Sequence, residues 1–250
     1  MSAIISISNS KGGVGKSTTA LNLGAALVAA GKTVLLIDND VQGNLTAAMG
    51  FTPAEQKNTL AKLLLAAIDS PEDVELHLPR TIMHTESGVD LIPANMKLSD
   101  AAARLQVMQL SQYNAVGEAE RPCEKVMAEA LKPVRGTYDY IIIDSPPMNI
   151  VSDAMAMHAG GGILLVVRYA RATYEDLSEA VKKMKLTDAN MLGFIVNDVE
   201  RNPPGLYSNR YKRYGYYGYY AYSYSRRRKQ TTPAPSAPKS PANGEPQKPL

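Results

Sequence analysis

This sequence of 250 residues contains few aromatic residues other than tyrosine and almost no cysteine. Tryptophan is absent, phenylalanine occurs twice, and Cys123 is the one cysteine. A single cysteine excludes an internal disulfide, and no cysteine and histidine spacing suits zinc. No apolar run approaches the roughly 20 residues of a membrane span, and the N-terminus lacks the features of a signal peptide. We therefore expect a cytoplasmic protein whose membrane association, if any, is made through a partner.

Charge and tyrosine are unevenly distributed along the chain. Residues 201–250 contain ten Lys or Arg against one acid, a net charge of +9, whereas the first 200 residues have a net charge of −6. Nine of the 14 tyrosines also follow residue 200. This last part begins at a helix-breaking RNPPG and ends in a stretch rich in Pro, Ala, Ser and Lys. We predict a disordered tail over residues 201–250, Tyr-rich and basic at first and then Pro-rich.

Short apolar runs alternate with amphipathic segments over the first 200 residues. The apolar runs are nearly continuous and rich in β-branched residues, which is typical of strands covered on both faces. The predicted strands are residues 3–8, 33–38, 89–93, 138–144, 162–167 and 192–197. The predicted helices are residues 17–30, 60–68, 99–110, 124–131, 151–158 and 173–184. This alternation predicts an α/β, doubly wound domain with a mostly parallel sheet over residues 1–200.

A glycine-rich stretch, SNSKGGVGKSTT, lies between the first predicted strand and the first predicted helix. Glycines allow the backbone N–H groups to point at phosphate oxygens, and the helix start adds its positive dipole end. Lys16 would neutralise the β- and γ-phosphates of ATP, and the Ser17 hydroxyl would bind Mg²⁺. The plain alternative is a glycine-rich turn with chance lysines. The residues that we expect to bind ATP here are Lys11, Gly12, Gly13, Val14, Gly15, Lys16, Ser17 and Thr18.

Polar residues end three of the predicted strands. Asp38 and Asp40 follow the second strand, Asp144 ends the fourth and Asn197 ends the last. Carboxylates at the carboxyl ends of parallel strands point into the crevice where ligands bind, so they can hold Mg²⁺ or accept a proton. An aspartate can equally cap the next helix or turn. Asn197 would read the adenine edge of ATP or form a turn.

The loop with two lysines resembles the deviant Walker A motif of ParA/MinD-type P-loop ATPases, the SIMIBI class. Residues 1–145 are similar to ParA partition ATPases, because DNDVQGN follows their D-x-D-P-Q-x-N pattern apart from one valine. The resemblance implies that Lys11 reaches across an ATP-sandwiched dimer to the partner's phosphates. It also implies that Asp38 positions the attacking water and that Asp144 is the Walker B acid. The catalytic residues that we expect are Lys16, Asp38 and Asp40.

Residues 144–225 resemble bacterial tyrosine kinases of capsule and exopolysaccharide synthesis, through DSPP, LLVVR, TYEDL and LGFIVNDV. Those kinases end in a tyrosine cluster that is autophosphorylated, and they pair with a membrane-anchored activator protein. In that reading Asp38 would activate the tyrosine hydroxyl, while Asp40 and Asp144 would organise Mg²⁺. The candidate autophosphorylation sites are Tyr214, Tyr216, Tyr217, Tyr219, Tyr220, Tyr222 and Tyr224.

Some residues depart from each pattern. Gln42 stands where the kinases usually have arginine, and Lys11 is a ParA feature. Partition ATPases, for their part, continue for several helices beyond the strand that ends here at Asn197. The two resemblances therefore favour different functions for the same ATP site.

The tyrosine cluster favours the kinase function over the partition function. A base-stacking surface would accept Phe or Trp, whereas a phosphoacceptor needs the hydroxyl group of tyrosine. We therefore predict an ATP- and Mg²⁺-dependent protein-tyrosine autokinase that phosphorylates its own tail and regulates capsule or exopolysaccharide synthesis or export. The alternative is a ParA-like ATPase for plasmid or chromosome partition, an ATP-dependent dimer whose basic tail binds DNA. Both functions predict a homo-oligomer, either a dimer or a ring; a third reading is a binding module without catalysis.

Overall fold

Helices and strands alternate in the computed structural model as the apolar pattern predicts. The model describes residues 2–9, 11–113, 125–146, 161–169, 171–186 and 190–199. Its strands are β1 (Ala3–Ser8), β2 (Val34–Asp38), β3 (Val89–Ile92), β4 (Tyr140–Asp144), β5 (Gly162–Arg168) and β6 (Asn190–Asn197). Its α-helices are α1 (Lys16–Ala29), α2 (Asn44–Ala48), α3 (Leu60–Asp69), α4 (Val74–Thr81), α5 (Leu98–Tyr113), α6 (Val126–Ala130) and α8 (Tyr174–Leu186). Short 3₁₀ helices cover Pro53–Glu55, Pro71–Asp73 and Lys132–Val134.

The six strands form one parallel sheet in the order β3-β2-β4-β1-β5-β6. The chain runs outward from β1 to β2 and β3, returns to place β4 between β1 and β2, and then runs the other way to β5 and β6. The direction of winding therefore reverses beside β1, and a sheet wound in this way binds ligands at its carboxyl edge near that reversal. The predicted α/β, doubly wound fold is confirmed.

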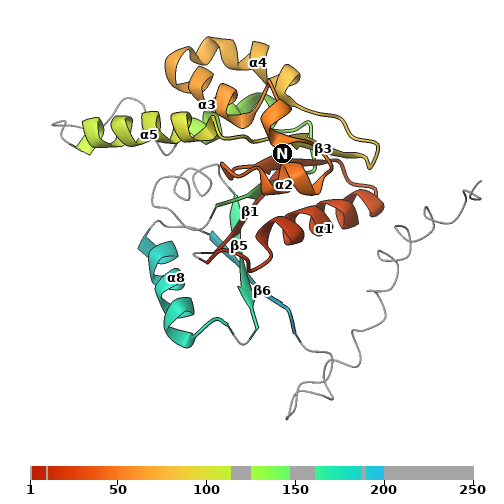
Figure 1. Cartoon of the computed structure of the whole chain (residues 1–250), viewed down its shortest axis with the longest axis vertical. Coiled ribbons are helices and arrows are strands. Elements are labelled where there is room, and N and C mark those ends of the chain that lie inside the picture. The colour runs from red at the N-terminus through yellow and green to blue at the C-terminus, as the bar shows by residue number, and fades with distance from the viewer. Residues whose placement is uncertain are drawn as a thin grey trace, which may run out of the picture. The chain divides into compact units, whose positions relative to one another are not determined.

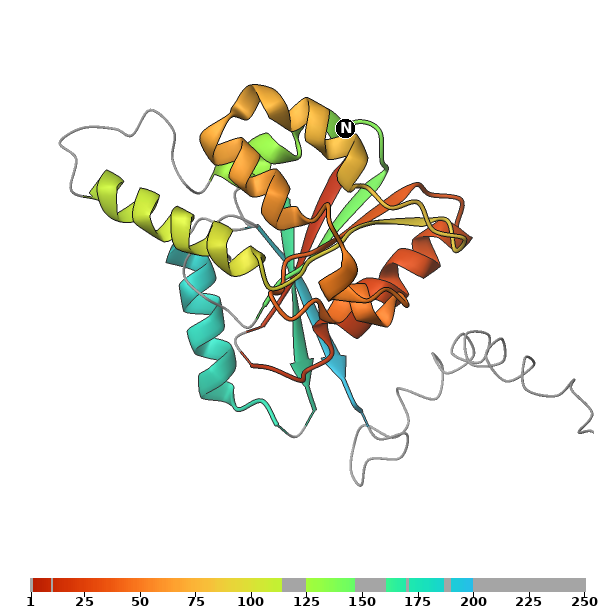
Figure 2. The same cartoon turned by 45° about the horizontal axis from the view of Figure 1, so that its top comes forward.

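Helices cover both faces of the central strands (Figures 1 and 2). Leu35 and Ile37 of β2 pack in a core with α3, α5 and α6, whereas Leu36 packs with α1 on the opposite face. Each of these three side chains has no exposed surface. A strand buried on both faces needs apolar residues at every position, which explains the unbroken VLLI of β2.

The third part of the core lies under α8. Ile163, Leu165 and Val167 of β5 pack against Ala180 and Leu177 of this helix. Beyond β5 lies β6, which pairs on one side with β5 and forms the edge of the described sheet. The sheet is therefore covered most completely at its centre.

The predicted strands all occur, with bounds within two residues of those expected. Two helices, α2 and α4, were not predicted, and the helix expected at 151–158 lies outside the described residues. The predicted tail over residues 201–250 also lies outside them, so its disorder and the domain boundary stay predictions. In the part of the chain that the structure describes, no helix is long and apolar enough to cross a membrane.

Candidate nucleotide-binding site

A cavity of about 720 Å³ opens at the carboxyl edge of the sheet, beside the loop that joins β1 to α1. This volume lies within the range of roughly 300–1,000 Å³ typical of small-molecule sites. The cavity is lined by Gly12, Gly13, Gly15, Lys16, Ser17, Thr18, Asp40, Val41, Gln42, Asn44, Ser145 and Pro146. The structure thus brings most of the predicted phosphate loop together with Asp40.

The loop between β1 and α1 has the geometry of a phosphate-binding loop. Gly15 precedes α1 with φ of 100°, a left-handed conformation that L side chains rarely adopt, and no side chain caps the helix. The N–H groups of the first turn therefore remain available to an anion at the positive end of the helix. Lys16 is 8% exposed, and its ammonium donates a hydrogen bond of 3.1 Å to the Lys11 carbonyl oxygen. That bond joins the two ends of the loop and holds the Lys16 ammonium beside the cavity.

Asp144 ends β4 next to the cavity-lining Ser145 and is 1% exposed, and it is not itself among the described residues that line the cavity. Neither of its buried carboxylate oxygens has a hydrogen-bond partner of ordinary geometry among the described residues. Burial raises its pKa to about 7; the neighbouring Ser17 hydroxyl and Lys16 ammonium lower it, and the Asp38 and Asp40 charges raise it further. Buried carboxylate oxygens are costly without a partner. This arrangement fits a divalent cation, which would supply that partner.

Asp38 and Asp40 lie two residues apart but have different surroundings. Asp38 is fully buried, and its Oδ2 accepts hydrogen bonds from the Thr46 N–H (2.8 Å) and hydroxyl (2.7 Å). Its Oδ1 accepts from the Asp40 N–H at 3.1 Å. Burial raises the pKa of Asp38, against the lowering effect of the Thr46 bonds. Both oxygens of Asp38 thus hold the fold together, and Asp38 is not among the described residues that line the cavity.

Asp40 faces the cavity instead. Its Oδ1 accepts a hydrogen bond from the Gln42 N–H at 3.0 Å, and its Oδ2 accepts one from the Asn44 amide at 3.0 Å. Both donors belong to the segment that follows β2, so this segment fixes the direction of the carboxylate. Of the two aspartates, Asp40 is the one placed to meet a bound phosphate or its water.

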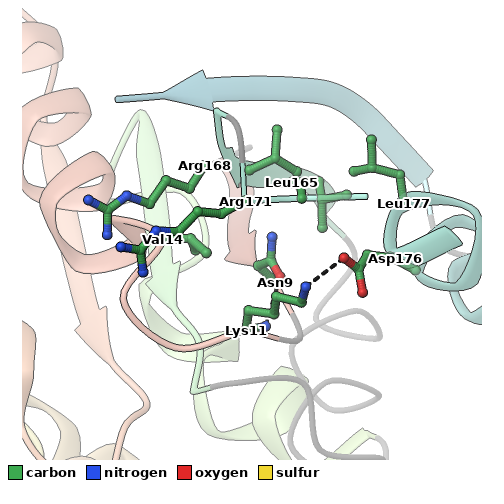
Figure 3. Close-up of a pocket in the computed structure, with 11 residues that line it drawn as sticks. Asn9, Lys11, Val14, Leu165, Arg168, Arg171, Asp176 and Leu177 are labelled. Atoms are coloured by element: carbon green, nitrogen blue, oxygen red, sulfur yellow. Dashed lines mark hydrogen bonds and ion pairs between the residues drawn. The ribbon is translucent and has the colours of Figure 1, made fainter. Parts of the chain in front are cut away.

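Lys11 points away from this cavity. Its ammonium forms an ion pair with Asp176 Oδ2 of α8 at 2.5 Å, in a second, small pocket between the loop, β5 and α8 (Figure 3). The hydrogen bond from Lys11, followed by those from Thr173, lowers the pKa of Asp176 to about 2. The role expected for Lys11, at the phosphates of a partner subunit, stays a prediction.

Asn197 is beside the loop rather than at a separate base pocket. Its side-chain amide donates a hydrogen bond of 3.0 Å to the Val14 carbonyl oxygen, and it lies so close to Gly15 that a Cβ there would come within 2.2 Å of Asn197 Nδ2. This contact supports the loop and uses one donor of the amide that was expected to read adenine. The seven candidate tyrosines of the tail lie outside the described residues.

Sequence reasoning missed several residues of the site. Gln42, Asn44 and Ser145 line the cavity, and Thr46 binds Asp38. The one available signal was the DNDVQGNLT segment, where amide and hydroxyl side chains closely follow two aspartates. Asp176 gave no signal, because its partner lies 165 residues away.

Fold and site together define a P-loop nucleotide-binding protein: a parallel doubly wound sheet, a glycine-rich loop opening a helix, and an acid ending the strand beside it. The family model described as "AAA domain" matches residues 2–193, and the chain belongs to that family. The relatives described below place the chain in the ParA-like family of P-loop ATPases.

Three relatives in sequence illustrate this family. The chain is 34% identical to an uncharacterized protein of Pseudomonas putida over 192 residues, which cover 76% of this chain and 65% of that protein. It is 33% identical to the sporulation initiation inhibitor protein Soj of Bacillus subtilis, with coverage of 76% and 68%. It is 32% identical to the chromosome partitioning protein ParA of Caulobacter vibrioides, with coverage of 73% and 62%. The match therefore spans about two thirds of the length of these relatives.

Solved structures show the same fold with nucleotide bound. Cobyrinic acid a,c-diamide synthase of Mycobacterium smegmatis, with an ATP analog and magnesium, has a TM-score of 0.64 and 27% identity, covering 78% of this chain and 75% of that one. The septum site-determining protein MinD of Pyrococcus horikoshii, with Mg-ADP, has a TM-score of 0.60 and is 27% identical. The match covers 81% of this chain and 73% of that one. The kinase domain of Escherichia coli tyrosine kinase ETK has a TM-score of 0.61 and is 24% identical, and the match covers 82% of this chain and 71% of that one. This likeness shows a shared fold alone.

Proposed function

We propose that this chain is a ParA-like partition ATPase that binds and hydrolyses Mg-ATP in the cavity beside the β1–α1 loop. The observation that carries the proposal is the position of Asp144 beside Ser17 and Lys16 of this loop, with buried oxygens that have no described hydrogen-bond partner. The relatives named Soj and ParA favour a partition function over the tyrosine kinase that the tail suggested, because the likeness to the kinase is one of fold.

The phosphates of ATP would lie along the loop. The cavity at the start of α1 is lined by Gly12, Gly13 and the residues from Gly15 to Thr18, whose backbone N–H groups would bind the phosphates, and Lys16 provides the cation. On binding, the Lys16 ammonium would exchange its hydrogen bond to the Lys11 carbonyl oxygen for bonds to the β- and γ-phosphates. The loop is built for this exchange, since Lys16 is already held close to its position of use.

Asp144, Asp40 and Ser17 are the residues that would hold Mg²⁺ directly or through water. When bound, Mg²⁺ supplies positive charge that neutralises the β- and γ-phosphate oxygens. The residues present fit this ion, because Asp144 has two buried oxygens to offer and Ser17 lies beside them in the first turn of α1. Such ligation would keep Asp144 ionised, against the effect of its burial.

Hydrolysis requires that a water oxygen form a bond to the γ-phosphorus while the bond from that phosphorus to the bridging oxygen of ADP breaks. Asp40 is the group that we assign to orient this water and to accept its proton, on the way to ADP and inorganic phosphate. The hydrogen bonds from the Gln42 N–H and Asn44 direct its carboxylate. The role predicted for Asp38 therefore passes to Asp40, and Asp38 fixes the turn between them through Thr46.

The proposed partners are a second copy of this chain and DNA. The ATP-dependent dimer rests on the likeness to ParA-type proteins and on the two-lysine loop. The net charge of +9 over residues 201–250 supports non-specific, salt-dependent binding to DNA phosphates.

A second candidate is autophosphorylation of the tail, favoured by seven tyrosines between positions 214 and 224. Chemically it differs in one respect: a tyrosine oxygen, rather than a water oxygen, attacks the γ-phosphorus. The same cavity would serve both reactions, so the product separates them.

One experiment tests both candidates. The chain is incubated with Mg-ATP, with and without double-stranded DNA, and phosphate release and intact mass are followed for the parent, Lys16→Ala and the exposed-lysine control Lys57→Ala. We expect hydrolysis that DNA stimulates, a loss of about 10²–10³-fold in Lys16→Ala, and no change in Lys57→Ala. A ladder of phosphate additions on the tail, absent from Lys16→Ala, would replace the partition function with the kinase. Absence of both products would overturn both functions.

A further inference from the structure

Lys11 has a built partner on the far side of the phosphate loop. The Lys11–Asp176 pair joins a residue of the β1–α1 loop to the first turn of α8, across 165 positions of sequence. The two side chains point toward each other, and Arg168 and Arg171 extend to the opposite side of the pocket (Figure 3). The loop therefore has one lysine at the cavity, Lys16, and one held away from it.

Asp176 is itself fixed in place. Its Oδ2 accepts hydrogen bonds of 2.9 Å from both the N–H and the hydroxyl of Thr173, and its own N–H donates to that hydroxyl at 3.2 Å. This is the reciprocal capping arrangement of a helix N-terminus. A carboxylate held in this way is a preorganised receptor for an ammonium group, and Lys11 occupies it.

The position of the Lys11 ammonium depends on the charge of Asp176. Among the described residues that line the pocket, Asp176 is the one acid beside three cations, Lys11, Arg168 and Arg171. Arg168 is paired outside the pocket with Asp198, at 2.8 Å. Without the Asp176 charge, no carboxylate among the described residues that line this pocket would remain to attract Lys11.

We propose that Asp176 is a positioning residue that holds Lys11 away from phosphate in the nucleotide-free chain, so that Lys11 serves ATP only when this ion pair opens. The inference rests on the proposed ATPase function and adds a contact that regulates when Lys11 can reach ATP. Lys11 and Asp176 are both substantially exposed, with side-chain exposures of 45% and 31%. An exposed pair contributes little stability, and a triphosphate, with several negative charges, is a stronger competitor for the ammonium.

The Lys11–Asp176 ion pair matters most for a phosphate that lies outside the cavity beside the β1–α1 loop. Lys11 is not among the described residues lining that cavity, so an ATP bound there meets Lys16 first. Lys11 then remains available, once released, for the nucleotide of a second copy. Opening of the pair would thus be one of the costs of ATP-dependent dimer formation, and its removal would favour the dimer at lower ATP concentration.

The first test measures the pair without nucleotide. The reactivity of the Lys11 amine toward a limiting acetylating reagent is followed by peptide mass spectrometry in the full chain. Asp176→Asn keeps the size and the acceptor oxygen for Thr173 but removes the charge, and we expect Lys11 acetylation to rise about two- to fivefold. Glu175→Gln removes a neighbouring charge and should not release Lys11. Thr173→Ala loosens the Asp176 carboxylate but keeps its charge, so it should release Lys11 less than Asp176→Asn does.

The second test measures the consequence. The ATP-analogue concentration that gives half-maximal dimer is determined by analytical ultracentrifugation in Mg²⁺ buffer. We expect Asp176→Asn to lower this midpoint about two- to fivefold, and we expect the effect to vanish when Lys11→Ala is added, because the pair is then absent in both forms. Glu175→Gln should leave the midpoint unchanged, and Thr173→Ala should lower it less than Asp176→Asn does.

The outcomes separate this inference from the function beneath it. Unchanged Lys11 acetylation in Asp176→Asn would overturn the positioning role, and so would an unchanged dimer midpoint. A midpoint shift that persists with Lys11→Ala, or that Thr173→Ala reproduces, would assign the effect to helix α8 and also overturn it. If the parent neither binds the analogue nor hydrolyses ATP, while Asp176→Asn still raises acetylation, the ATPase proposal fails instead.

Discussion

The centre and the edge of the sheet differ in burial although their sequences look alike. Every residue of β2 is buried, whereas along β6 Leu192, Phe194 and Val196 remain 53%, 45% and 49% exposed. Both strands are nearly continuous apolar runs in the sequence. The site is built at the centre, on the ends of β1, β2 and β4, and β6 contributes Asn197 at its last position. Buried strands thus hold the acids, while an edge strand supports the loop from the side.

This difference shows what a phosphate site requires of its scaffold. The carboxylates of Asp38 and Asp144 can be kept in low-dielectric surroundings because the strands before them are packed on both faces. An edge strand has helices on fewer sides, so it cannot exclude water in the same way.

The largest expected difference concerns one substitution made in both regions. Leu36→Ala in β2 removes a fully buried side chain that contacts Gly24 of α1, and we expect a loss of about 3–5 kcal/mol in the free energy of unfolding. Leu192→Ala in β6 removes a half-exposed side chain and should cost less than about 1 kcal/mol. Urea unfolding followed by circular dichroism measures both. Equal losses would mean that β6 is as well packed as the centre.

The next prediction concerns the pH dependence that Asp144 confers. Its pKa rises from 3.8 in an unfolded chain to about 7 in the fold, chiefly through burial. The folded state therefore binds more protons between these values, and this group's contribution to stability falls as pH rises from about 4 to about 7. At about 1.4 kcal/mol per pKa unit the loss is on the order of 4 kcal/mol.

Asp144→Asn isolates this effect, because an amide cannot ionise. We expect the variant to lose that part of the pH dependence, to be more stable than the parent at pH 8 without Mg²⁺, and to lose Mg²⁺-dependent ATP hydrolysis. Unfolding midpoints between pH 4 and pH 8 provide the measurement, with the exposed Asp69→Asn as control. An unchanged pH profile would show that Asp144 is not held in a raised-pKa environment.

The smallest expected effect concerns the support of Asp38. The Thr46 hydroxyl donates to Asp38 and accepts a hydrogen bond of 3.0 Å from the Ala94 N–H at the end of β3. Thr46→Val leaves two buried polar groups without this partner, and we expect a loss of about 1–3 kcal/mol in the free energy of unfolding. Thr46→Ser retains the hydroxyl and should recover most of that loss. If Thr46→Val, which keeps the methyl group, loses no stability, the hydrogen bonds of the hydroxyl do not stabilise the fold.

The sequence predicts the fold well because the signals for strands and for the glycine loop are local in the sequence. Strand runs buried on both faces, such as VLLID, and the glycine loop before α1 are readable within a few residues. Helix α4 was missed because Pro79 lies inside it and its polar content hides the apolar stripe. The exposure of β6 could not be predicted either, since an apolar run reads the same at the edge of a sheet as at its centre.

The site was predictable as far as the motif extends. The loop and Asp40 line the cavity as expected, whereas the burial of Asp38 depends on Thr46 and Ala94, which approach it only in the folded chain. The partner of Lys11 is of the same kind, because Asp176 belongs to a distant helix. Electrostatic partners that are remote in sequence follow from topology, and no spacing rule reveals them.

The contact between Asn197 and the Val14 carbonyl has a consequence for synthesis on the ribosome. The two residues are 183 positions apart in the chain. At roughly 5–20 residues per second, the phosphate loop waits about 10–40 s after its own translation before Asn197 exists to support it. The nascent chain therefore contains a complete Walker-type motif long before it has the side support of that loop, and full nucleotide affinity is expected to arise late, as β6 joins the sheet.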